Sequence, residues 1–303
     1  MLKLKTVFFG THEFAVTILK ELLARDFISV ELVITQPDRK VGRKQTTEES
    51  PIKKLATAHN IPIGQPESLK NYTLPFTPDL NIVAQYGLII PKKIINAPKF
   101  GSINVHGSIL PKYRGASPIQ SALINGEKET GVTIMLMDEK MDNGPILTQK
   151  SLPIDEYDNY AALSGKMAVM GSELLTDTVQ KYVAGYINSK PQEGEPTFTK
   201  LLTKEDGKID FNKTADEIYN QYRGLSTWPG VWTTWNGKRL KLLKIAKSEK
   251  TLPAGQTAVE NKKILIGCGN GTIEIFELQL EGKNPTDAKT FLNGYKNFVG
   301  TKL

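Results

Sequence analysis

The chain has 303 residues, of which 39% are hydrophobic and 23% charged, and its formal net charge is +7. This length is comfortable for two domains that each bury a core. The single cysteine, Cys268, excludes an intrachain disulfide, and Gly10 cuts short the apolar start at residues 7–9, so we expect a cytoplasmic protein with neither a signal peptide nor a membrane span.

The positive charge is concentrated in the last third of the chain. Residues 204–303 carry 16 Lys and Arg against 11 Asp and Glu, whereas residues 1–203 carry 23 against 21. A basic surplus in the smaller part favours an acidic partner such as nucleic acid. An ordinary solvated surface is the alternative interpretation, because surplus lysines occur on many proteins.

Apolar runs alternate with helical patterns in the first part of the chain. Strands are predicted at residues 6–9, 30–35, 80–84, 101–106 and 132–137, and helices at residues 13–24, 52–59 and 160–182. Strands that are separated by helices imply parallel pairing with right-handed crossovers. The expected fold is therefore α/β, with a doubly wound, mostly parallel, Rossmann-like sheet and a ligand site at the carboxyl ends of its strands.

Two polar residues end one of these strands. Asn104 and His106 share one face of the strand at residues 101–106, because successive side chains point in opposite directions. Asp142 follows 36 residues after His106. An amide offers donors to an oxygen that gains negative charge, and a histidine beside a carboxylate can shuttle a proton near neutral pH. Such a set is suited to acyl transfer without a metal or a covalent nucleophile, although a buried, satisfied polar pair is the alternative for Asn104 and His106.

The pattern changes after the long helix. Residues 188–199 contain Pro191, Gly194 and Pro196, a composition typical of a linker. A short helix is predicted at residues 215–223, and strands at residues 231–235, 239–245, 264–266 and 272–278, with a hairpin turn at residues 236–237. This pattern predicts a small β-barrel. The expected domains are residues 1–187, which carry the candidate catalytic residues, a linker at residues 188–203, and the barrel at residues 204–303.

Two other patterns indicate ordinary structure. The glycine run at residues 267–271 lies between predicted strands with no helix after it, so it predicts a turn rather than a phosphate-binding loop. The three histidines and one cysteine show no ligand spacing, so no metal site is expected. His12 is expected at the start of a helix, and His59 on a surface face.

Several short sequence motifs are distributed along the chain. They are FGT at 9–11, TQPDR at 35–39, AQYGLIIP at 84–91, INVHGS at 103–108, RGASPIQ at 114–120, ETGVTI at 129–134, MDNG at 141–144, WPG at 228–230 and LEGKNP at 280–285. In these motifs the chain resembles the methionyl-tRNA formyltransferases, within the wider family of enzymes that take a formyl group from 10-formyltetrahydrofolate. The resemblance spans nearly the whole chain. Relatives that act on glycinamide ribonucleotide or amino sugars are not expected to carry this C-terminal domain.

The resemblance implies a function and roles for the three polar residues. The implied reaction moves the formyl group of 10-formyltetrahydrofolate to the α-amine of initiator methionyl-tRNA, giving N-formylmethionyl-tRNA for translation initiation. Asn104 and His106 are expected to stabilise the oxyanion. Asp142 is expected to hold His106 in position and to organise a water or accept a proton from the amine. The C-terminal domain is expected to be an OB-like barrel that binds tRNA, and nothing demands more than a monomer.

Folate is expected to bind where flat apolar walls meet backbone hydrogen-bonding groups. Three segments suit this requirement, and their residues are Leu88, Ile89, Ile90, Pro91, Ser108, Ile109, Leu110, Pro111, Asn143 and Gly144. For residues 88–90 a place in the core is the alternative interpretation.

The segment at residues 36–51 resembles the family's flexible loop that engages the acceptor end of tRNA. Its candidate contacts are Arg39, Arg43 and Lys44, and Arg43 is singled out because arginine makes bidentate contacts that lysine cannot. Glu48 and Glu49 stand where relatives often have lysines, and their charge is expected to repel phosphate. A solvated surface loop is the alternative.

Two other functions remain open from the sequence. An enzyme that formylates an amino sugar is expected to carry nucleotide-sugar contacts in place of the basic barrel. A non-enzymatic RNA-binding protein has no reason to keep Asn104, His106 and Asp142 together.

Overall fold

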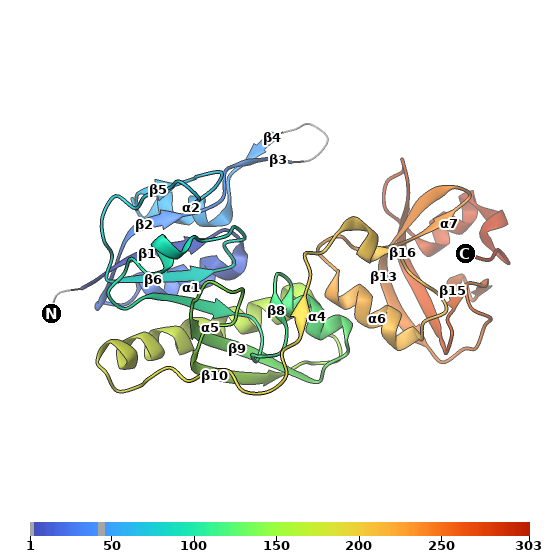
Figure 1. Ribbon diagram of the computed structural model, residues 1–303. Helices are drawn as coiled ribbons and strands as arrows, with labels where there is room; N and C mark the ends of the chain where they lie inside the picture. Colours follow the sequence, from blue (N-terminus) through green and yellow to red (C-terminus); the bar gives the residue numbers. More distant parts are fainter. Residues whose placement is uncertain (1–2, 42–45) are drawn as a thin grey trace. The chain divides into compact units, whose positions relative to one another are not determined.

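The chain folds into two compact units. The computed structural model describes residues 3–41 and 46–303 (Figure 1). The first unit contains the residues up to 118 together with 129–153 and 164–199, and the second contains residues 119–128, 154–163 and 200–303. In the described ranges, no helix is both long and apolar enough to cross a membrane.

The first unit is built on a mixed sheet of seven strands (Figure 1). In spatial order these are β10 (Ile146–Pro153), β9 (Glu129–Leu136), β7 (Ser102–His106), β6 (Leu80–Ala84), β1 (Leu4–Gly10), β2 (Ile28–Ile34) and β5 (Ile63–Gly64). The strands from β7 to β5 pair in parallel. Parallel strands that are covered on both faces are apolar throughout, which explains why residues 80–84 are buried without alternation.

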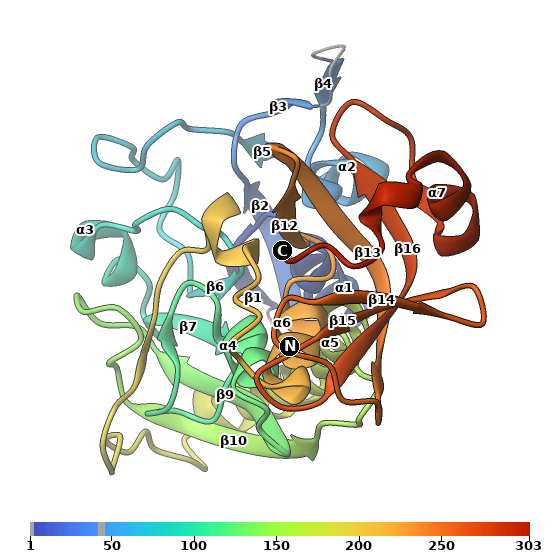
Figure 2. The same cartoon turned by 90° about the vertical axis from the view of Figure 1, so that its right-hand side faces the viewer.

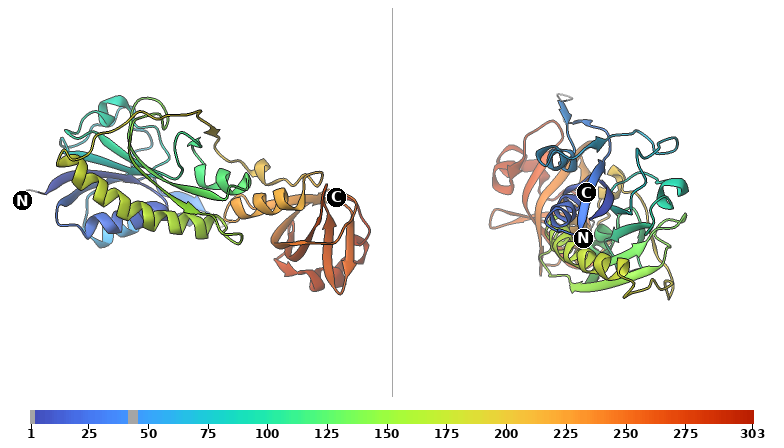
Figure 3. Two further views of the ribbon diagram at one scale, coloured as in Figure 1. Left: turned by 90° about the horizontal axis from the view of Figure 1, so that it is seen from below. Right: turned by 90° about the vertical axis from the view of Figure 1, so that its left-hand side faces the viewer.

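Two helices cover one face of this sheet. A Cβ atom added to Gly10 of β1 would meet Ala15 of α1 (Glu13–Leu23), and one added to Gly171 of α5 (Tyr160–Val183) would meet Val105 of β7. The pairing registers place Val105 on the same face as Gly10. In Figure 3 the α1 helix (blue) and the α5 helix (olive) accordingly lie on the same side of the strands.

Irregular segments cover the opposite face. Phe9 and Val83 belong to a buried cluster there, together with Leu69 and Tyr86 from the connecting segments and the short helix α3 (Lys92–Ile95). Burial raises the pKa of the Tyr86 phenol to about 12, so this group stays neutral in the core. Asn104 is aligned with Val83 in the parallel pairing and so points to this face. The polar residues of β7 therefore lie under loops rather than under a long helix.

The direction of β9 differs from the prediction of parallel pairing. β9 runs antiparallel to β7, with Thr133 opposite His106. Residues 107–117 are used in a loop at the end of β7, and the helix that follows, α4 (Pro118–Ile124), has seven residues and rises only about 10 Å. A parallel crossover must carry the chain back along the sheet, and this connection does not. β9 therefore starts at the edge where β7 ends, and β10, which the sequence did not predict, pairs antiparallel to β9.

The segment at residues 36–51, where a flexible loop is expected, contains a ribbon of two short paired strands. β3 (Arg39–Val41) and β4 (Thr46–Glu48) pair antiparallel and stand away from the sheet (Figure 1). Asp38 anchors the base of the ribbon, because its carboxylate accepts hydrogen bonds from Lys53 of α2 (Pro51–Ala58) at 2.5 Å and from Gln65 at 2.7 Å. His12 precedes α1, and the exposed His59 ends α2, as predicted.

The second unit contains an antiparallel sheet (Figure 2). Its strands are β12 (Val231–Trp235), β13 (Lys238–Ser248), β16 (Thr272–Leu280), β15 (Lys263–Gly267), β14 (Thr257–Glu260) and β17 (Thr286–Asp287), and its further elements are α6 (Ala215–Gly224), α7 (Ala288–Gly294), η1 (Lys204–Gly207) and η2 (Lys296–Phe298). Gly267 pairs with Thr272, which confirms the predicted turn between paired strands. Trp235 packs on Phe291 and Phe298 in the core, with ring centroids 5.9 and 5.2 Å away. Across residues 204–303, all of which are described, no pairing joins β12 to β14, so the barrel closure is not established.

Two glycines of α5 provide a test of the packing on the first face. A Cβ atom on Gly165 would meet nothing within 4 Å, whereas one on Gly171 would lie 3.2 Å from Val132 and 3.3 Å from Val105. Gly165→Ala is therefore expected to raise the free energy of unfolding by about 0.5–1 kcal/mol, the gain in helix propensity. Gly171→Ala is expected to have a lower free energy of unfolding than Gly165→Ala, because crowding of the new methyl group against the sheet opposes the same gain. Urea unfolding measures both, and equal stabilisation by the two substitutions would contradict the described packing.

Candidate functional site

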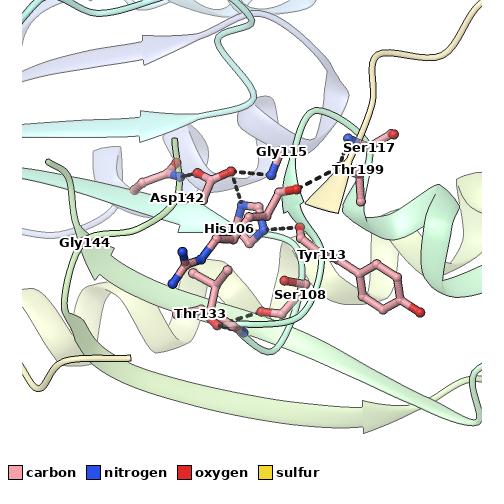
Figure 4. Close-up of polar contacts among 12 residues, drawn as sticks. His106, Ser108, Tyr113, Gly115, Ser117, Thr133, Asp142, Gly144 and Thr199 are labelled. Atoms are coloured by element: carbon pink, nitrogen blue, oxygen red, sulfur yellow. Dashed lines mark hydrogen bonds and ion pairs between the residues drawn. The ribbon is translucent and has the colours of Figure 1, made fainter. Parts of the chain in front are cut away.

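The carboxylate of Asp142 is the meeting point of the three predicted residues. Its Oδ1 accepts a hydrogen bond from Asn104 Nδ2 at 3.3 Å, and its Oδ2 accepts one from the Gly115 N–H at 2.7 Å. The same Oδ2 lies 3.6 Å from His106 Nδ1 (Figure 4). The side chains of His106 and Asp142 are only 5% and 14% exposed. The structure thus brings together residues that lie up to 38 positions apart.

The orientation of the His106 ring follows from its second contact. His106 Nε2 lies 3.0 Å from the carbonyl oxygen of Tyr113. A carbonyl oxygen only accepts, so Nε2 carries a proton and donates it. The ring therefore turns Nδ1 towards Asp142, and Nδ1 is the nitrogen left for chemistry.

The backbone at this site adopts conformations that few residues tolerate. Asp142 has φ +50° and Tyr113 has φ +62°, both in the left-handed region. Such conformations cost of order 1 kcal/mol for a residue with a side chain, and they gather at functional sites where surrounding contacts hold them. Gly144 permits the close return of the loop, because a Cβ atom there would lie 1.9 Å from the Leu136 carbonyl oxygen.

Thr133 fixes the loop that follows β7. Its hydroxyl donates to the Ser108 carbonyl at 2.6 Å and accepts from the Leu110 N–H at 3.1 Å and from Gln149 Nε2 at 2.8 Å. Thr133 lies opposite His106 in the β7–β9 pairing, so the wall beside the imidazole is built on paired strands. Sites carried by paired strands hold their geometry better than sites on free loops.

The predicted folate residues follow neighbouring strands, because β6 and β7 pair side by side. Ile90 is buried in the core with Leu88 packed against it, while Ile89 is 85% exposed. The Ser108 hydroxyl donates to the Lys112 carbonyl at 2.6 Å, and the Asn143 amide donates to Asp138 at 2.9 Å. The side chains of Ser108 and Asn143 are therefore already engaged within the protein.

The predicted tRNA contacts are described only in part. Arg39 is exposed and donates to Gln36 Oε1, whereas Arg43 and Lys44 lie outside the described residues. Glu49 pairs with Lys53 at 3.1 Å, and Glu48 approaches Lys54 at 3.9 Å. Each glutamate thus has a basic neighbour on α2, which reduces the repulsion of phosphate that the sequence predicted.

Several groups at the site had no signal in the sequence. The Gly115 N–H and the Tyr113 carbonyl are backbone groups, which any residue type supplies. Gln192 donates to the backbone of Asp142 from 50 positions away. Among the described residues, no group of three or more side chains suited to a metal ion is found.

Comparison with known proteins gives a consistent family assignment. Residues 4–179 match the family model described as Formyl transferase, and residues 201–296 match Formyl transferase, C-terminal domain. The chain is 43% identical to the methionyl-tRNA formyltransferase of Thermodesulfovibrio yellowstonii, with 96% of each chain covered, and 42% identical to that of Enterococcus faecalis, with 98% of each covered. Both relatives match this chain over nearly its full length.

A solved structure shares the fold. The N-formyltransferase from Helicobacter canadensis, in complex with folinic acid and dTDP-3-aminofucose, superposes with a TM-score of 0.66 at 22% identity, covering 91% of this chain and 99% of that one. Coverage of this extent reaches into the C-terminal unit. At 22% identity this likeness shows the fold alone, so the expectation that relatives acting on amino sugars lack this particular C-terminal domain stays a prediction. The full-length identity to the methionyl-tRNA enzymes carries the family assignment.

The close return at Gly144 gives a test of the loop that carries Asp142. In Gly144→Ala the new Cβ atom meets the Leu136 backbone, so the loop must move. We expect hydrogen exchange at residues 138–146 to accelerate and the free energy of unfolding to fall by about 1–3 kcal/mol. Gly294→Ala is the control, because a Cβ atom there meets nothing within 4 Å. Unchanged exchange in Gly144→Ala would show that the loop has more room than described.

Proposed function

The chain belongs to the methionyl-tRNA formyltransferase family, and we propose that Asn104, His106 and Asp142 carry out its reaction. The enzyme transfers the formyl group of 10-formyltetrahydrofolate to the α-amine of methionyl-tRNA. The observation that supports the three roles is the Asp142 carboxylate, which contacts Asn104 and Gly115 and faces His106. With the initiator methionyl-tRNA, the product of the reaction is N-formylmethionyl-tRNA, which is used in translation initiation.

The residues match the demands of the reaction. When the amine attacks the formyl carbon, the carbonyl oxygen gains negative charge and needs donors. The Asn104 amide has two N–H groups and gives one to Asp142, which leaves one for this oxygen. Asp142 accepts the proton that the amine loses, directly or through a water. As the C–N10 bond breaks, a proton returns to N10, so protons balance over the transfer.

His106 acts through Nδ1 in this proposal. Its Nε2 proton is held by the Tyr113 carbonyl, so only a proton on Nδ1 reaches the reaction centre. A protonated Nδ1 donates to the developing oxyanion and is stabilised by the Asp142 carboxylate 3.6 Å away. Asp142 then orients the imidazole, and its carboxylate balances the imidazolium charge until it accepts the proton from the amine.

The folate donor binds between the loops that follow β6 and β7, with residues 142–144 opposite. The segments involved are residues 88–91 and 108–111. Because the Ser108 and Asn143 side chains are engaged internally, we assign their contribution to backbone groups. Leu88, Ile90 and Leu110 supply partly or fully buried apolar surface.

Acceptor recognition is divided between two parts of the chain. Residues 1–187 contain the catalytic residues, residues 188–203 connect, and residues 204–303, with their net charge of +5, bind tRNA. We assign an OB-like architecture to this part because its antiparallel sheet and basic surplus suit a nucleic-acid surface. The β3–β4 ribbon, with Arg39 described at its base, contacts the acceptor end through Arg43 and Lys44.

The proposal extends to location and assembly. A charged tRNA acceptor suits a cytoplasmic enzyme, because translation occurs there, and we propose a monomer, since no feature of the sequence demands a second copy. Formylation of an amino sugar and non-enzymatic RNA binding are the alternatives. Incubation with the folate donor and either charged initiator tRNA or an amino-sugar nucleotide separates them by which acceptor gains a formyl group, and a non-enzymatic protein formylates neither.

Two substitutions test the catalytic roles. Asn104→Ala and Asp142→Ala are expected to lower the single-turnover rate of formylation by about 100- to 1000-fold, because each removes a group that acts on charge in the transition state. Folate affinity and thermal unfolding are expected to stay close to those of the wild type. Asp26→Ala, an exposed aspartate in the turn before β2, is the matched control. Rapid turnover in either variant would remove the assigned role.

Arg43 tests the acceptor contact. Arg43→Ala is expected to raise the KM for charged tRNA by about tenfold, the loss of one charge-assisted hydrogen bond, and to lessen the salt dependence of tRNA binding. The affinity for folate should hardly change. Arg25→Ala, at the end of α1, removes an exposed arginine as a control. Equal losses for both ligands would count against a tRNA-specific contact.

A further inference from the structure

Residues 190–199 form a strap across the proposed catalytic centre. Their composition predicts a linker, yet they pair with both loops that hold Asp142 and His106. At one end, Lys190 and Ile146 exchange backbone hydrogen bonds of 2.7 and 2.8 Å. At the other end, β11 (Phe198–Thr199) pairs in parallel with β8 (Arg114–Gly115). The strap is therefore fixed at each end to one wall of the site.

Gln192 lies in the middle of the strap and contacts both walls. Its Nε2 donates to the carbonyl oxygens of Asp142 at 2.8 Å and Gly144 at 2.9 Å. Its Oε1 accepts from Arg114 Nε at 3.0 Å and Nη2 at 2.7 Å. Arg114 Nη1 in turn donates to Asn143 Oδ1 at 2.8 Å. Two carbonyl oxygens of the turn that carries Asp142 thus accept from the Gln192 amide nitrogen, and the amide oxygen is engaged by Arg114 of the other wall.

Two threonines of the strap hold the opposite wall. The Tyr113 N–H donates to Thr197 Oγ1 at 2.8 Å. The Ser117 N–H donates to Thr199 Oγ1 at 3.1 Å (Figure 4). Tyr113 supplies the carbonyl that orients His106, and Gly115, between them, supplies the N–H that binds Asp142. The strap therefore supports the backbone partners of both the imidazole and the carboxylate.

The turn at residues 142–144 needs such support. Asp142 has φ +50°, and Gly144 passes so close to Leu136 that a Cβ atom would lie 1.9 Å from its carbonyl oxygen. A strained turn relaxes when its contacts are removed. Catalysis is sensitive to this, because a displacement of about 1 Å at a catalytic group can cost about 100-fold in rate.

We propose that Gln192 is a positioning residue for formyl transfer, which holds the backbone of residues 142–144 and through it the Asp142 carboxylate. This inference rests on the proposed role of Asp142. It concerns the transfer step first, because Gln192 bonds to the backbone of the turn that carries the Asp142 carboxylate and to Arg114.

The full-length enzyme tests this with three variants. Gln192→Ala is expected to lower the single-turnover rate by about 10- to 100-fold, a larger factor than its effect on the KM for the folate donor. Gln192→Glu keeps an acceptor for Arg114 but loses both donors and places charge against two carbonyl oxygens, so its loss is expected to be at least as large. Glu193→Ala, the exposed neighbour in the strap, is the matched control with unchanged activity. If Gln192→Ala lowers the Tm, the rate is measured instead with Gln192→Met, whose side chain is uncharged and of similar length.

A double-mutant cycle separates positioning from general stability. If Gln192 acts through Asp142, Gln192→Ala in the Asp142→Ala background costs no more than about twofold. An undiminished loss in that background, or a wild-type rate in Gln192→Ala, overturns the inference. The proposed function fails separately: a fast Asp142→Ala enzyme refutes the role of Asp142, whereas a slow Asp142→Ala enzyme with fast Gln192 variants refutes only the positioning role.

Discussion

The carboxylate of Asp142 joins parts of the chain that are distant in sequence. It receives hydrogen bonds from the Asn104 side chain and the Gly115 backbone, and it faces His106. Because its side chain is only 14% exposed, these charge-assisted contacts are weakly screened by solvent. A buried carboxylate without such donors is costly, so the groups that contact Asp142 keep its charge satisfied in the position that the reaction uses.

The two faces of the sheet are covered by different kinds of segment, and this difference determines where the Asp142 carboxylate lies. On one face, α1 and α5 pack closely on the sheet, so that a Cβ atom added to Gly10 or Gly171 would meet apolar side chains. On the other face, the segments around β7 and β9 are loops, and loops carry binding residues on a rigid scaffold. Asn104 and His106 point to this second face because their pairing register fixes it. The reversed direction of β9 then places Thr133 beside His106, where its hydroxyl fixes the loop that follows β7.

The sequence predicted the parts of the site that depend on local periodicity. Asn104 and His106 are two positions apart on a strand, so their common face follows from alternation alone. The direction of β9 was not predictable in this way. It depends on the conformation of residues 107–117, which form a loop and leave only the short helix α4 between β7 and β9. The Gly115 N–H and the Tyr113 carbonyl are backbone groups and carry no residue signature. Gln192 lies in a segment whose proline and glycine content predicts a linker, and only the tertiary structure shows its contacts.

The account depends on the transferable carbon lying among Asn104, His106 and Asp142. A crystal structure of this enzyme with folinic acid, a stable folate whose formyl group lies on N5 next to N10, tests this most directly. We expect the pteridine between residues 88–91 and 108–111, with the formyl end directed at Asn104 Nδ2 and His106 Nδ1, within direct or water-bridged hydrogen-bond distance. A folate bound with its formyl end away from the Asp142 carboxylate, or on another face of the sheet, would contradict the account.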